Sequence, residues 1–194
     1  MTPRQVDRFD EAAPEIALAP PEQFEREVAA AAARAAGGVP HALLVLALER
    51  VVDVRRECGP AAEAALVSIV QRALFDLAGP AALGTWLRPD RLAVLHPRCL
   101  PRDALAFARR ARIALEGGQF LWQGLSFRLG AYIGVLELRG PDVMPGDQIA
   151  RALRACEGAV ALGGDGIVFG AGDPAEQAAL DAENAWREHL REVI

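Results

Sequence analysis

A short turn in the middle of this chain places one carboxylate between two arginines. Arg88-Pro89-Asp90-Arg91 separates two apolar stretches, residues 81–87 and 92–96, which predict the strands of a hairpin. Proline fixes the backbone at the second position of a tight turn, and aspartate suits the third. A carboxylate there has the chemistry of a metal ligand, but a lone one flanked by Arg88 and Arg91 forms an ion pair more readily than a magnesium site.

The other residues able to bind metals or act as nucleophiles are scattered along the chain. Three cysteines and three histidines form no CxxC pair and no zinc-ligand spacing, which favours ordinary structural roles for all six. Every basic side chain is arginine, so a mechanism that needs a lysine amine is excluded. The net charge of −5 argues against general binding of nucleic acid through its phosphates.

Length and composition predict one folded domain with an extra element at each end. The chain has 194 residues, of which 52% are hydrophobic, and no apolar run approaches the roughly 20 residues of a membrane span. The first residues carry no basic-then-apolar signal peptide. We therefore expect a cytoplasmic protein without membrane contact.

The hydrophobic pattern predicts the elements that position the turn. Helices are predicted at 20–36, 59–79, 101–116, 147–162 and 173–194, and strands at 41–48, 81–87, 92–96, 120–122, 125–138 and 167–169. This order predicts an α/β (α+β) protein with a mixed, largely antiparallel central sheet flanked by helices. Residues 1–19 are predicted to be an N-terminal extension or linker, 20–172 the domain, and 173–194 a C-terminal linker helix.

Four short segments in this order make the chain resemble the GGDEF family of diguanylate cyclases. Residues 18–24 look like the family's Leu-x-Asn-Arg-x-x-Phe, and 88–92 stand at its Gly-Gly-Asp/Glu-Glu-Phe turn. Residues 132–135 match its Ser-Ile-Gly-Val, and 152–163 look like its closing helix. The resemblance covers about Leu18 to Phe169 and implies a GGDEF, nucleotidyl-cyclase-like fold with a ferredoxin-like core.

Active members of that family condense two GTP molecules with metal ions held by carboxylates. Most of the family's functional side chains are replaced in this chain. The matching positions are Ala47 for metal ligation, Glu49 for the second aspartate of the same Asp-x-Asp segment, Arg55 and Ala64 for guanine recognition, Val52 and Val160 for the phosphate-binding lysines, and Arg88, Pro89, Asp90, Arg91 and Leu92 for the turn. The resemblance therefore implies a domain that has lost cyclase activity, is not an enzyme and holds no metal or cofactor.

The family's product-inhibition motif, Arg-x-x-Asp, would fall on residues 79–82, which read Gly-Pro-Ala-Ala. We therefore expect no cyclic-di-GMP binding by that route.

Our first hypothesis is a catalytically inactive regulatory and protein-interaction domain in cyclic-di-GMP signalling, acting on or alongside an adjoining EAL domain. The last predicted helix resembles the linker that leads from GGDEF domains into EAL phosphodiesterase or cyclic-di-GMP receptor domains, and its uncapped end predicts a fragment of a longer protein. The candidate interaction residues are Arg88, Arg91, Trp186 and Leu190. Another signalling protein as partner and a homodimer stay open, and no nucleic-acid partner is expected.

Two other hypotheses remain. Five arginines near the family's pocket (Arg50, Arg55, Arg56, Arg88 and Arg91) are either solvated surface charge or a site for an anion. In the second case the chain is a metal-independent nucleotide (GTP) sensor without turnover. The third hypothesis is a residual enzyme that uses Glu49 and Asp90 as its carboxylates.

Overall fold

A computed structural model describes residues 16–138, 140, 142–163 and 166–170 of the chain. Its helices are α1 (Pro21–Ala36), α2 (Val51–Cys58), α3 (Pro60–Ala78), α4 (Pro101–Glu116) and α5 (Pro145–Leu162). Its strands are β1 (Ala17–Leu18), β2 (Ala42–Leu48), β3 (Leu83–Arg88), β4 (Arg91–His96), β5 (Gln119–Trp122), β6 (Leu125–Arg128), β7 (Ala131–Glu137) and β8 (Ile167–Gly170).

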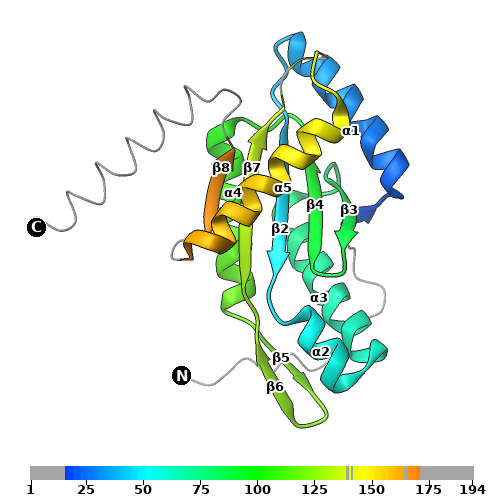
Figure 1. The fold of residues 1–194 in the computed structure, drawn as a ribbon, viewed down its shortest axis with the longest axis vertical. Coiled ribbons are helices and arrows are strands. Elements are labelled where there is room, and N and C mark those ends of the chain that lie inside the picture. The colour runs from blue at the N-terminus through cyan, green and yellow to red at the C-terminus, as the bar shows by residue number, and fades with distance from the viewer. Residues whose placement is uncertain (1–15, 139, 141, 164–165, 171–194) are drawn as a thin grey trace, which may run out of the picture.

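Six of these strands form the central sheet, in the order β1-β3-β4-β2-β7-β8 (Figure 1). The four inner strands pair antiparallel, and the two edge strands β1 and β8 pair parallel to their neighbours. Strands β5 and β6 make a separate hairpin that extends beyond one end of this sheet. The predicted mixed, largely antiparallel sheet is therefore confirmed.

Helices cover both faces of the sheet, and this explains the unbroken apolar sequence of β2. Leu44, Leu46 and Leu48 belong to the core shared with α3 and α4, whereas Leu43 and Val45 belong to the core shared with α1 and α5. Successive side chains of a strand point to opposite faces, so a strand covered on both sides must be apolar at every position.

The structure differs from the sequence prediction in two internal elements. The strand expected over residues 125–138 is two strands, because β6 pairs only with β5 and the chain enters the central sheet after Gly130. Helix α2 was not predicted, since its eight residues are too few for a clear helical period.

The structure bears on one of the two predicted terminal segments, residues 1–19, and does not describe the other, residues 173–194. Residues 16–19, expected in the extension, join the fold: Ile16 is buried, and Ala17 and Leu18 pair with β3. The helix expected over 173–194 lies outside the described residues.

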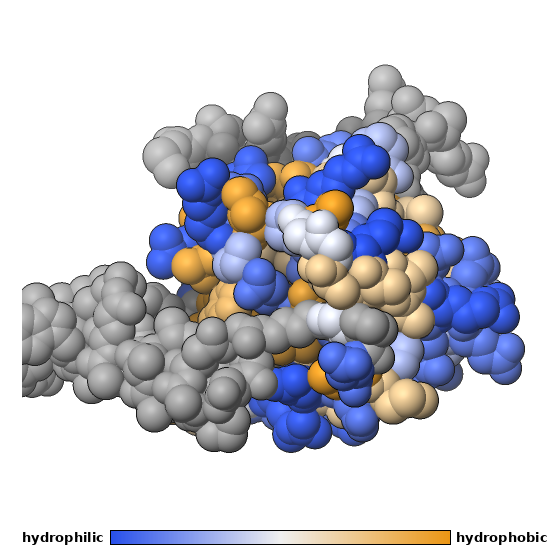
Figure 2. Space-filling model, turned by 90° about the horizontal axis from the view of Figure 1, so that it is seen from above, coloured by the Kyte–Doolittle hydropathy of each residue, from blue (hydrophilic) through white to orange (hydrophobic). Residues whose placement is uncertain are grey.

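Within the described residues, no helix combines the length and the apolar character needed to cross a membrane. Figure 2 shows the molecule from the end of the sheet at which β2 begins. Hydrophobic residues are scattered among hydrophilic ones in the coloured part of this face.

Candidate functional site

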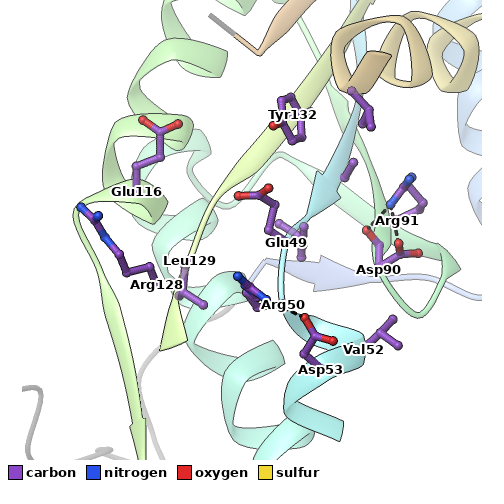
Figure 3. A pocket seen from close by; sticks show the side chains of 13 residues that line it. Glu49, Arg50, Val52, Asp53, Asp90, Arg91, Glu116, Arg128, Leu129 and Tyr132 are labelled. Atoms are coloured by element: carbon purple, nitrogen blue, oxygen red, sulfur yellow. Dashed lines mark hydrogen bonds and ion pairs between the residues drawn. The ribbon is translucent and has the colours of Figure 1, made fainter. Parts of the chain in front are cut away.

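A pocket of about 670 Å³ lies where β2 ends and where β4 and β7 begin (Figure 3). Its volume is in the range of small-molecule sites. The lining residues come from both sheets and from α2, α4 and α5: Ala47, Leu48, Glu49, Arg50, Val52, Asp53, Asp90, Arg91, Glu116, Arg128, Leu129, Tyr132 and Val160.

Two backbone hydrogen bonds hold the end of β2 at the pocket. The Leu48 N–H donates to the Asp90 carbonyl, and the Glu49 N–H donates to the Gly130 carbonyl, each at 2.9 Å. Arg50 then adopts a left-handed backbone, with φ 69°, and this turns the chain from β2 into α2. Glu49 and Arg50 therefore project from a short turn that is tied to both neighbouring strands.

The predicted β3–β4 hairpin is confirmed, with Pro89 and Asp90 as its two turn residues. Neither of them has a positive φ, so the turn is not one of the primed types that match the twist of a hairpin. The pairing register accordingly shifts between Trp86 and Arg88. This irregularity lets a proline-containing turn close the hairpin beside the pocket.

The carboxylate of this turn is engaged by its neighbour. Arg91 Nη1 lies 2.5 Å from Asp90 Oδ2, as expected of a lone acid beside arginines. The other arginine of the turn, Arg88, is exposed and lies 3.8 Å from a carboxylate oxygen of Glu157 on α5. Asp90 is thus part of an ion pair at the rim of the pocket.

Ala47, which the resemblance places at a metal-ligand position, lies between two larger side chains. Its partners across the sheet are Arg91 on β4 and Tyr132 on β7, and such partners share one face of the sheet. Ala47 itself is 3% exposed and offers no side-chain oxygen.

Most charged groups of the pocket are already paired. Asp53 accepts from Arg50 at 3.0 Å and from Arg56 at 2.7 Å. Glu116 pairs with Arg112 of the same helix, and Asp90 pairs with Arg91. Among the described residues, two charged groups of the pocket have no hydrogen bond or ion pair: the Glu49 carboxylate and the Arg128 guanidinium.

The residues present do not fit the carboxylate-held metal site of the family. Ala47 has no side-chain oxygen that could ligate a metal, and the Asp90 carboxylate forms an ion pair with Arg91. The described part of the chain contains no group of three His, Cys, Asp or Glu side chains that could hold a metal ion. Of the carboxylates that line the pocket, only that of Glu49 is without an arginine partner among the described residues, which is the low end of the one or two carboxylates that usually hold magnesium.

The pocket contains some of the residues singled out from the sequence and not others. Val160, 40% exposed at the end of α5, lines it. Arg55 and Ala64 do not: Arg55 pairs with Glu63 at 3.1 Å, and Ala64 is exposed on α3. Leu92 is fully buried in the core. Trp186 and Leu190 lie outside the described residues.

The sequence analysis missed several pocket residues, and three polar ones among them come from segments distant in the chain. Glu116 ends α4, Arg128 ends β6, and Tyr132 lies near the start of β7. The last two flank the break between β6 and β7, which the continuous strand pattern conceals. The Ser-to-Tyr change within Tyr132-Ile133-Gly134-Val135 was the one signal in the sequence.

Comparison with known proteins gives one curated relative and several structures with the same fold. No protein-family model matches the chain. The chain is 27% identical over 152 residues to the probable diguanylate cyclase DgcE of Escherichia coli (strain K12). This match covers 76% of the chain but only 14% of the relative, so the chain corresponds to a small part of that protein.

The solved structures confirm the fold. The GGDEF domain of DgcB from Caulobacter crescentus, in complex with c-di-GMP, superposes with a TM-score of 0.71 at 18% identity, covering 84% of this chain and 95% of that one. The active GGEEF domain of a diguanylate cyclase from Vibrio cholerae gives 0.69 at 14% identity, covering 78% and 97%. An EAL/GGDEF domain protein from M. capsulatus gives 0.63 at 15% identity, covering 78% and 99%. The chain has a GGDEF-like fold.

These comparisons contradict the prediction that the chain is not an enzyme. The curated relative is named a probable diguanylate cyclase, and one structural neighbour is described as an active domain of such a cyclase. The replaced side chains at Ala47 and in the turn are therefore not a sufficient basis for excluding catalysis.

Proposed function

We propose that this chain is a GGDEF-type domain of cyclic-di-GMP signalling that binds a guanine nucleotide in the pocket at the end of β2. The observation that carries this proposal is the pocket itself, about 670 Å³ in volume, beside the β3–β4 turn. By the resemblance, the family's GTP-binding residues match positions around this turn and the end of β2. The names of the relatives supply the chemical class of the ligand.

The guanidinium groups of the pocket suit the phosphates of such a ligand. Arg128 has no acidic partner among the described residues, and the side chain of Arg50 is 59% exposed beside Asp53. A guanidinium group presents a fork of N–H donors that matches phosphate oxygens, and it does so without a metal. Arg128 is therefore assigned to the phosphate end of the nucleotide.

Calorimetric titration with GTP, with and without magnesium, tests this function. We expect binding in both conditions, and about tenfold weaker binding or more after Arg128→Ala, the loss typical of one charge-assisted contact. The matched control is Arg154→Ala, because Arg154 is exposed on α5 and outside the pocket. No heat with GTP in either condition would refute the proposal. The same samples are assayed for cyclic-di-GMP, since the relatives are named as cyclases.

A regulatory role alongside an EAL domain is a second proposal. One structural neighbour is an EAL/GGDEF domain protein, and the chain matches only 14% of the much longer curated relative. Arg88 supports an interaction role because it is exposed at the end of β3, and its one ion pair within the described part of the chain is long, at 3.8 Å.

Pull-down of an EAL domain from the source cells tests this second proposal. The bait is the chain, unaltered or carrying Arg88→Ala, Arg91→Ala, Trp186→Ala or Leu190→Ala. Capture that one of these substitutions abolishes would locate the contact. Failure to capture any EAL domain or other signalling protein would refute the regulatory role and leave the nucleotide proposal standing.

A further inference from the structure

The Glu49 carboxylate is the one acidic group of the pocket that has no partner among the described residues. We propose that Glu49 recognises the guanine base of the bound nucleotide, by accepting hydrogen bonds from its N1–H and its 2-amino group. This inference rests on the proposed nucleotide-binding function and assigns the residue that determines base specificity.

The pairing of the other acids singles out Glu49. Asp53 accepts from arginines on both of its oxygens, and Asp90 and Glu116 each form an ion pair with one arginine, so the charge of all three is already balanced. Glu49 is exposed to the pocket and is held by its backbone rather than by its side chain. Its two oxygens are therefore available to a ligand that presents donors.

The position of the Glu49 side chain depends on a glycine across the strand pair. The Glu49 N–H donates to the Gly130 carbonyl, and the carboxylate lies over the Gly130 α-carbon. A Cβ atom at residue 130 would lie 2.1 Å from Glu49 Oε2, a distance at which the carboxylate must move. In Figure 3 the carboxylate lies between Tyr132 and Arg50. Gly130 is thus a positioning residue for Glu49.

The neighbouring groups fit a planar base followed by a phosphate. Tyr132 also lines the pocket and brings an aromatic ring to the side of Glu49, where a base can pack against it (Figure 3). Arg128 and Arg50 line the same pocket and supply the cationic end. The pocket thus combines a carboxylate that can accept hydrogen bonds from a base with guanidinium groups that can bind phosphates.

Guanine is the base whose donors match a carboxylate. Its N1–H and 2-amino group lie side by side, so both can donate to the two oxygens of one carboxylate. Adenine has an acceptor at N1 and hypoxanthine lacks the 2-amino group, so neither can make the pair. Arg55 and Ala64, at the family's guanine-recognising positions, offer no side-chain acceptor.

Binding of GTP, ITP and ATP to the unaltered chain, Glu49→Gln and Gly130→Ala tests the inference. We expect the unaltered chain to prefer GTP over both analogues by about tenfold or more. Glu49→Gln replaces one acceptor oxygen by a donor, and Gly130→Ala displaces the carboxylate. Both should therefore weaken GTP binding until the preference over ITP disappears.

Two control variants separate base recognition from general effects of charge and of added methyl groups. Glu57→Gln removes an equivalent charge on α2 outside the pocket, and Gly158→Ala adds a methyl group on α5 where no atom lies within 4 Å. Both should keep the GTP preference. If GTP binds but Glu49→Gln keeps its preference over ITP, the assignment of Glu49 is refuted while the proposed function stands. If the unaltered chain binds no GTP, both fail.

Discussion

Gly134 allows α5 to pack against the central sheet more closely than any other residue would. It lies in the middle of β7, between Val45 of β2 and Val168 of β8. A Cβ atom at this position would lie 2.3 Å from the Cys156 nitrogen and 2.5 Å from the Ala152 oxygen. Both atoms are helix backbone and cannot rotate away, so Gly134→Ala must push the helix from the sheet.

The size of the effect follows from that displacement. An ordinary contact of a Cβ atom begins at 3.4 Å, so α5 must retreat by about 1 Å, from 2.3 Å to 3.4 Å. The helix buries Ile149, Ala152, Cys156 and Ala159 against the sheet, and a gap of this size weakens the dispersion contacts of all of them. Overpacking of a core costs typically 1–3 kcal/mol. We expect about 3 kcal/mol here because the clash is with backbone.

Urea unfolding followed by circular dichroism measures this loss of free energy. In thermal unfolding the expected shift in Tm is about 6–12 °C downward for a chain of this length. Gly158→Ala is the matched control within α5, because no atom lies within 4 Å of its added methyl group and alanine favours a helix interior. It should leave stability unchanged or raise it by up to about 1 kcal/mol.

A Gly134→Ala variant that loses less than about 1 kcal/mol would refute this reasoning, because the helix–sheet contact would then be adaptable. The same variant should also weaken GTP binding, since α5 carries Val160 into the pocket.

Three further predictions concern buried polar groups. Burial, helped by nearby arginines, lowers the pKa of His41 below its usual 6.5, so the unfolded state takes up the proton first. The free energy of unfolding should therefore fall as the pH drops below about 6.5. His41→Gln should reduce this dependence on pH when the free energy is measured by urea unfolding at a series of pH values. Thr85→Val removes the buried hydroxyl that donates to the Ala19 carbonyl at 2.9 Å and should cost about 1–2 kcal/mol, with faster hydrogen exchange in β1; unchanged exchange there would contradict this role. Burial raises the pKa of the Cys99 thiol to about 11, so Cys99 should resist alkylation at pH 8 in the folded chain while the more accessible Cys58 reacts; equal rates would show that Cys99 is exposed.

Local sequence signals predicted most elements of this fold. Prolines at the first turns and glycines after the last mark α1, α3, α4 and α5, and the observed helices lie within two residues of the predicted bounds. The strand expected over residues 125–138 was wrong because its alternation continues through Gly130, where the chain passes from one sheet to another. Periodicity reports which side of a strand is buried, not which strand is its partner.

The candidate site was only partly predictable for the same reason. Asp90 was expected to pair with a neighbouring arginine, and the Asp90–Arg91 contact needs only adjacent residues. The sequence analysis named Glu49 as a carboxylate near the family's metal-ligand position. Whether an arginine forms an ion pair with it depends on which side chains lie nearby in space. Arg128 and Tyr132 reach the pocket through the β6–β7 connection, which no local pattern showed.

The sequence by itself determined most strands and helices, the turn at Pro89-Asp90 and the substitutions at the family's functional positions, because each depends on residues close together in the chain. The ion pairs of Asp53, Asp90 and Glu116 are likewise local, because each is made with an arginine of the same turn or helix. Only the tertiary structure decided that Glu49 lies over Gly130, with no ion-pair partner among the described residues. This contact depends on strand register, which brings together residues far apart in the chain. The substitutions alone pointed to a lost active site, whereas their arrangement in space shows a charged pocket with groups available for a ligand.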